Sequence, residues 1–155
     1  MEKNLSIRKV ITPVDFSKNA DFIARSAIYI AGAFKASLTF VFVVQNFEDY
    51  SGFFVPEMNM PNLERDLHVN AEKKMKSFCL EYEELCKENG ITSFENTVLV
   101  GDVADQIADF TLQEKGDMIV MGTHGYKGLE KVMFGSVADK VVKLAHCPVT
   151  TINPY

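Results

Sequence analysis

The residues best suited to chemistry in this sequence are three glycines and a serine near its C-terminus. Gly122 and Gly125 follow an apolar run, and Gly135 and Ser136 come after nine intervening residues. Glycines let backbone N–H groups approach an anion without a side chain in the way. A helix that begins after them would add the positive end of its dipole. This spacing predicts a phosphate-binding loop.

Ser136 fits such a loop in two ways. Its hydroxyl could donate to a phosphate oxygen, or it could cap the final helix by accepting from N–H groups two or three residues further on. Capping alone would make the loop a structural turn. His124 lies inside the loop, where we expect a solvent-exposed side chain rather than a proton carrier.

The elements that position this loop follow from five apolar, β-branched runs, which are expected to be strands: Lys9 to Thr12, Leu38 to Val44, Thr97 to Val100, Met118 to Met121 and Val149 to Ile152. Segments with helical spacing separate them. This order predicts an α/β fold with a doubly wound, five-stranded parallel sheet in a three-layer α/β/α arrangement. Ligands of such sheets bind outside the carboxyl ends of the strands, where the loop would lie.

Glycines mark the expected ends of three helices. We expect the first helix to stop at Gly32, the second at Asn89-Gly90 and the third at Gly116. The second helical pattern runs unbroken from Leu67 to Leu85, and the fourth helix is expected to open at about Ser136.

Length and charge limit the classes of protein to consider. With 155 residues, 47% of them hydrophobic, the chain suits one ordinary domain, residues 1–155. A net charge of −5 argues against nucleic acid, which needs clustered Lys and Arg. The apolar runs fall short of the roughly 18 residues of a membrane span, and the N-terminus lacks the apolar core of a signal peptide. We expect a soluble, cytoplasmic protein.

Two further features carry expectations. The three cysteines, Cys79, Cys86 and Cys147, form no CxxC pair, so we expect packed thiols without a disulfide or zinc. The connection from Gln45 to Asn62 is unusually long and aromatic. It could pack its aromatic side chains on the domain, form a lid over the ligand, or bind a partner.

The motif Gly122-x-x-Gly125-x9-Gly135-Ser136, with Val137-Ala138 after it, resembles the nucleotide-binding signature of the universal stress protein family. The stretches "KVITPVDFSKNA" from Lys9 and "VGDVADQIADF" from Val100 are similar to that family's first strand and turn and its third strand and helix. The resemblance covers nearly the whole chain. It implies a Rossmann-like fold of the adenine nucleotide α-hydrolase-like type.

The resemblance also implies a set of ATP-binding residues, because this sequence keeps every position of the motif. Those implied at the adenosine end are Pro13, Asp15, Val43, Met121 and Gly122, and those implied at the ribose and phosphates are Gly125, Gly135, Ser136 and Val137. Two of them have other readings. Asp15 could cap the turn near Ser17, and Val43 could be a plain core residue.

By the same resemblance, the expected function is a nucleotide-dependent stress-response module that binds ATP with Mg²⁺ and forms a homodimer through its C-terminal strand. We identify no catalytic or metal-ligating residue, so we expect a nucleotide-binding protein rather than an enzyme with fast ATP hydrolysis. Slow ATP hydrolysis or autophosphorylation is a further alternative. The alternative is a scaffold that responds to AMP or to a partner peptide at Gly52 to Met58. The turn after the first strand contains neither GxGxxG nor a P-loop motif.

Overall fold

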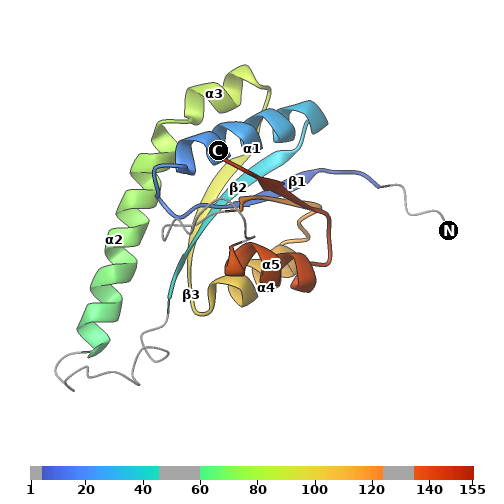
Figure 1. Ribbon diagram of the computed structural model, residues 1–155. Coiled ribbons are helices and arrows are strands. Elements are labelled where there is room, and N and C mark those ends of the chain that lie inside the picture. The colour runs from blue at the N-terminus through green and yellow to red at the C-terminus, as the bar shows by residue number, and fades with distance from the viewer. Residues whose placement is uncertain (1–4, 46–59, 124–134) are drawn as a thin grey trace.

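The computed structural model describes residues 5–45, 60–123 and 135–155. Its elements in chain order are β1 (Lys9–Pro13), α1 (Ala20–Phe34), β2 (Ser37–Val44), α2 (Met60–Leu80), α3 (Glu83–Glu88), β3 (Phe94–Val100), α4 (Val103–Gln113), β4 (Met118–Gly122), α5 (Ser136–Leu144) and β5 (Val149–Ile152). The strands form one parallel sheet in the order β3-β2-β1-β4-β5. Helices α1, α2 and α3 cover one face, and α4 and α5 cover the other (Figure 1). The expected doubly wound α/β fold is confirmed.

The central strands are buried on both faces, which explains their near-continuous apolar sequences. Alternate residues of β1, β2 and β4 point to opposite sides, so each strand contributes to two hydrophobic clusters. The cluster beneath α1, α2 and α3 includes Val10, Phe40 and Val120, and the cluster beneath α4 and α5 includes Ile11, Val41 and Ile119.

The edge strand β3 begins at Phe94, three residues before the expected start at Thr97. Polar Glu95 and Asn96 hid its beginning, because an edge strand is more exposed and tolerates polar side chains. All seven residues of β3 nevertheless pair with β2, from Phe94 opposite Leu38 onward.

The first helix does not stop at Gly32 as expected. α1 runs on to Phe34, and Lys35 ends it with a left-handed backbone, φ 54°. Gly32 serves a different purpose, since a Cβ there would lie 2.8 Å from the backbone oxygen of Asn89. Glycine at this position lets α1 approach the end of α3.

Gly116 shows the same kind of difference. α4 already ends at Gln113, and Lys115 supplies the left-handed residue, with φ 55°. A Cβ on Gly116 would lie 2.8 Å from the Thr111 side chain and 2.9 Å from that of Ile11, so this glycine permits close packing of the helix end on β1. The expected stop at Asn89-Gly90 is confirmed.

The second helical pattern is divided between α2 and α3. The chain turns at Glu81 and Tyr82, and the Tyr82 hydroxyl donates to Asp21 of α1 at 2.8 Å. α2 begins at Met60, so the last three residues of the Gln45 to Asn62 connection are helical. The rest of that connection beyond Gln45, and the Gly52 to Met58 segment within it, lie outside the described residues.

Two of the three thiols pack in the core, as expected. Cys79 and Cys86 are buried, and burial raises the pKa of the Cys79 thiol to about 12 and that of Cys86 to about 11. Within the described ranges, no helix is both long and apolar enough to cross a membrane.

Within the described residues, the Thr12 hydroxyl is the buried side-chain polar atom without a hydrogen-bond partner. Thr12→Val should therefore be neutral or raise the free energy of unfolding by up to about 1 kcal/mol, because it removes an unsatisfied group at nearly constant shape. The matched control is Thr111→Val, since Thr111 is also buried but its hydroxyl donates to the Ile107 carbonyl at 2.7 Å. That variant should lose about 1 kcal/mol. Denaturant titration measures the free energy of unfolding of both variants. A larger loss for Thr12→Val than for Thr111→Val would show that the Thr12 hydroxyl is not unsatisfied.

Candidate functional site

The candidate site lies at the carboxyl edge of the sheet, between β1 and β4. These neighbouring strands lead to helices on opposite faces, since α1 follows β1 and α5 follows β4. The two helices lie on opposite sides of the sheet (Figure 1). A switch of this kind is where open α/β sheets have their ligand crevice.

Asp15 lies in the turn that follows β1. Its Oδ1 accepts from the Ser17 N–H at 3.0 Å, so the local turn that was one of its two readings is present. Within the described residues, its second carboxylate oxygen makes no hydrogen bond. Phe16 anchors the turn by packing its ring 4.7 Å from that of Phe42. Asp15 is therefore held in place with one oxygen left for another donor.

Val43 and Met121 lie near the ends of β2 and β4, on the face covered by α4 and α5. Both are buried, at 7% and 4% exposed, in the same hydrophobic cluster. Core packing of the Val43 side chain is thus observed. Pro13, half-buried at the end of β1, shares this face because it lies two residues beyond Ile11 of the same cluster.

The backbone of Val43 has a second property. The Val14 N–H donates to the Val41 carbonyl at 2.8 Å, which is the last bond between β1 and β2. Backbone groups two residues apart in a strand point the same way, so the N–H and C=O of Val43 face the space that β1 has left. A planar base with a donor and an acceptor on its edge suits such a pair.

The two ends of the glycine loop meet at Thr123. Its carbonyl accepts from the Gly135 N–H at 2.8 Å, and its own N–H donates to Ile152 of β5 at 3.0 Å. The loop between them, including Gly125 and His124, lies outside the described residues. The hydrogen bond between Gly135 and Thr123 fixes the start of α5 directly beside the end of β4.

Gly135, not Ser136, occupies the residue position just before α5. It has φ −51° and ψ 141°, and no side chain caps the helix. Ser136 is the first residue of the helix, and its side chain is exposed. The reading of Ser136 as a cap is therefore not observed. The first N–H groups of α5 face the carboxyl edge without a capping oxygen, which is the arrangement that an anion can satisfy.

A charged group that sequence reasoning missed lies beside the site. Lys140 of α5 places its Nζ 3.0 Å from Asp102 and 3.1 Å from Asp105. Asp102 also caps α4 by accepting from the Asp105 N–H at 3.0 Å. Both hydrogen bonds lower the pKa of Asp102, and the one from the Asp105 N–H has the larger effect. The sequence shows the aspartate pair in "GDVAD", but it does not show that Lys140 of another helix is the partner of that pair.

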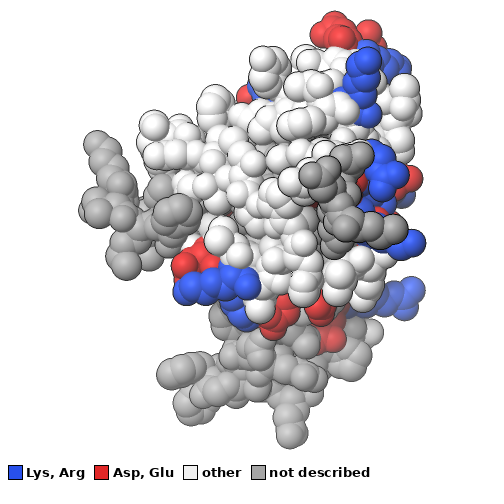
Figure 2. Space-filling view, turned by 90° about the vertical axis from the view of Figure 1, so that its right-hand side faces the viewer, with Lys and Arg blue, Asp and Glu red and all other residues white. Residues whose placement is uncertain are grey.

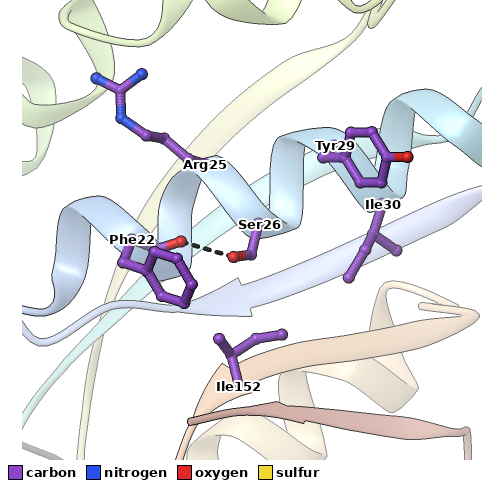
Figure 3. A pocket seen from close by; sticks show the side chains of 6 residues that line it. All are labelled: Phe22, Arg25, Ser26, Tyr29, Ile30 and Ile152. Carbon is purple, nitrogen blue, oxygen red and sulfur yellow. Dashed lines mark hydrogen bonds between the residues drawn. The ribbon is translucent and has the colours of Figure 1, made fainter. Parts of the chain in front are cut away.

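A surface groove lies elsewhere, between α1 and β5. Its lining is mainly apolar and is formed by Phe22, Arg25, Ser26, Tyr29, Ile30 and Ile152 (Figure 3). No residue of the candidate site lines it. Ile152 connects the groove to that site, because its carbonyl accepts from the Thr123 N–H at 3.0 Å.

The structure thus gathers eight of the nine expected site residues at one sheet edge, and the ninth, Gly125, lies outside the described residues. The fold defines a doubly wound α/β protein, a class whose members bind their ligands at such an edge of the sheet. The sequence pattern of the universal stress protein family matches residues 6–153. The chain belongs to that family.

Individual relatives agree with this assignment. "Universal stress protein MJ0531" of Methanocaldococcus jannaschii is 33% identical over 148 residues, covering 94% of this chain and 82% of that protein. The structure of universal stress protein UspA from Lactobacillus plantarum matches with a TM-score of 0.80 and 25% identity over 96% of this chain and 99% of that one. A universal stress protein from Archaeoglobus fulgidus, determined in complex with dAMP, has a TM-score of 0.61 and 19% identity over 96% of this chain and 98% of its own.

Proposed function

We propose that this universal stress protein binds ATP, together with Mg²⁺, at the carboxyl edge between β1 and β4, and that occupancy acts as a signal in the cytoplasm. The observation that carries the proposal is the uncapped start of α5 at Gly135 and Ser136, closed against Thr123. The dAMP complex of the Archaeoglobus fulgidus protein supports an adenine nucleotide as the ligand class.

The site residues divide the nucleotide between them. The backbone of Val43 would read the base edge, while Pro13, Met121 and Gly122 form the wall beside it. The free oxygen of Asp15 would accept from a ribose hydroxyl or help to hold the metal. The N–H groups of Ser136 and Val137, the Ser136 hydroxyl and the backbone at Gly125 would receive the phosphates. Gly135, whose own N–H donates to Thr123, would leave room for them because it has no side chain.

Mg²⁺ in this proposal is held chiefly by the phosphates. In the part of the chain that the structure describes, no group of three or more His, Cys, Asp or Glu residues is placed to hold a metal. This fits Mg²⁺, which keeps several waters and uses one or two carboxylates beside substrate phosphates. When bound, the ion would neutralise phosphate charge in a chain of net charge −5.

The proposal is for binding rather than turnover. We assign no general base and no catalytic cation, and the order of events is binding followed by a change at the surface that a partner reads. The alternative ligand is AMP, which would need the base and ribose contacts but not the full phosphate cradle.

Thermal unfolding of the protein, denatured and refolded to remove carried nucleotide, tests this proposal. At 100 times its dissociation constant, MgATP should add about 2.7 kcal/mol. For a chain of this size the midpoint should rise by roughly 5 to 11 °C. GTP should give a smaller shift. A shift with AMP equal to that with MgATP would favour the alternative, and no shift with any nucleotide would refute the proposal.

We also propose a homodimer formed through β5, which is an edge of the sheet. The N–H groups of Ile119 in β4 and of Thr123, just after β4, donate to the carbonyls of Pro148 and Ile152. The backbone groups of the alternate residues Val149 and Thr151 therefore face outward. Such an edge can pair with a second copy. On this side of the molecule uncharged side chains fill the middle of the surface (Figure 2), and the groove beside Ile152 lies next to the strand (Figure 3).

A further inference from the structure

Lys140 is placed one turn beyond Ser136 on α5, so both side chains lie on the same face of the helix. Side chains of a helix lean toward its N-terminus. The Lys140 ammonium group is therefore directed toward the end of α5 at which the phosphates are proposed to bind.

The ion pairs of Lys140 locate that ammonium group further. Asp102, 3.0 Å from Nζ, is the first residue outside α4 and follows β3 after Gly101. The Gly101 N–H donates to the carbonyl of Val44, at the end of β2, at 2.9 Å. The ammonium group thus lies between the starts of α4 and α5, at the same sheet edge as Val43.

These ion pairs are exposed enough to exchange. The side chains of Lys140, Asp102 and Asp105 are 45%, 49% and 53% exposed. Ion pairs at such exposure contribute little to stability, because water screens them. A phosphate group carries more negative charge than one carboxylate and offers several acceptor oxygens, so it can compete for the lysine.

Building on the proposed ATP site, we propose that Lys140 is a specificity-determining residue that binds the outer phosphates of the nucleotide. In the absence of nucleotide its ammonium group is held by Asp102 and Asp105. When a nucleoside triphosphate binds, it transfers to a phosphate oxygen. AMP, whose single phosphate remains at the start of α5, leaves the ion pairs in place. Lys140 thereby raises the affinity for a nucleoside triphosphate relative to the affinity for a monophosphate.

The test is a calorimetric titration of Lys140→Met with MgATP and with AMP. MgATP affinity should fall about tenfold, the effect of one charge-assisted hydrogen bond, while AMP affinity stays within about twofold of the unsubstituted protein. The matched control is Lys143→Met on the same helix. Lys143 is 70% exposed and pairs with Asp139 at 2.7 Å, so its loss should change neither affinity.

A second variant should act in the opposite direction. Asp102→Asn with Asp105→Asn releases Lys140, while asparagine still caps α4, so MgATP affinity should rise. Unchanged MgATP affinity in Lys140→Met, or equal losses for MgATP and AMP, would overturn the role of Lys140 and leave the ATP site standing. Failure of the unsubstituted protein to bind any nucleotide would overturn the proposed function and this inference together.

Discussion

Gly135→Val should abolish MgATP binding while leaving the protein folded. Gly135 has φ −51° and ψ 141°, a backbone conformation open to any residue, so the substitution introduces no backbone strain. Its branched side chain would instead occupy the space through which phosphates approach the start of α5. The stabilisation of about 2.7 kcal/mol expected at 100 times the dissociation constant should disappear, as measured by thermal unfolding with and without MgATP.

Gly135→Ala is the matched control for that variant, because it adds only a methyl group at the same allowed backbone conformation. It should retain part of the affinity. The midpoint of Gly135→Val without nucleotide should remain close to that of the unsubstituted protein. A folded Gly135→Val that binds MgATP normally would show that the phosphates do not lie at the start of α5.

Thr151→Pro should convert the proposed dimer into monomers. The Thr151 N–H faces away from β4, so proline removes an outward donor without breaking a bond within the sheet. Because a two-fold symmetric interface contains each hydrogen bond twice, the substitution removes two of them. The dissociation constant of the dimer should rise at least about tenfold. Light scattering at micromolar concentration measures the change.

Thr151→Val is the control for the edge strand, because it keeps the backbone N–H and suits a strand. It should remain dimeric. If the unsubstituted protein is a monomer at micromolar concentration, or if Thr151→Pro stays dimeric, then β5 is not the interface.

The sequence predicted the sheet well because its signals are local and strong. β2 was predicted to within one residue, since buried parallel strands need continuous apolar runs. β5, although an edge strand, was predicted to the residue because all four of its residues are β-branched. Helix ends were harder. Gly32 and Gly116 looked like stops, but both are explained by close packing against residues far away in the sequence, and Lys35 and Lys115 take the left-handed positions.

The candidate site likewise combines local features, which the sequence shows, with a contact between distant residues, which it does not show. The glycine-serine spacing and the Asp15 turn can be read from short stretches, and the sheet order then brings them to one edge. Lys140 could not be found in this way. Its ion pair with Asp102 joins residues 38 positions apart, and it exists because α4 and α5 pack side by side.

Hydrogen exchange with and without MgATP tests the central claim most directly, because it reports both binding and its location. The account predicts new protection in the turn around Asp15, at the end of β2, and from Gly122 to Val137, with little change elsewhere on the sheet. Identical exchange with and without MgATP would contradict it, as would protection confined to the groove between α1 and β5.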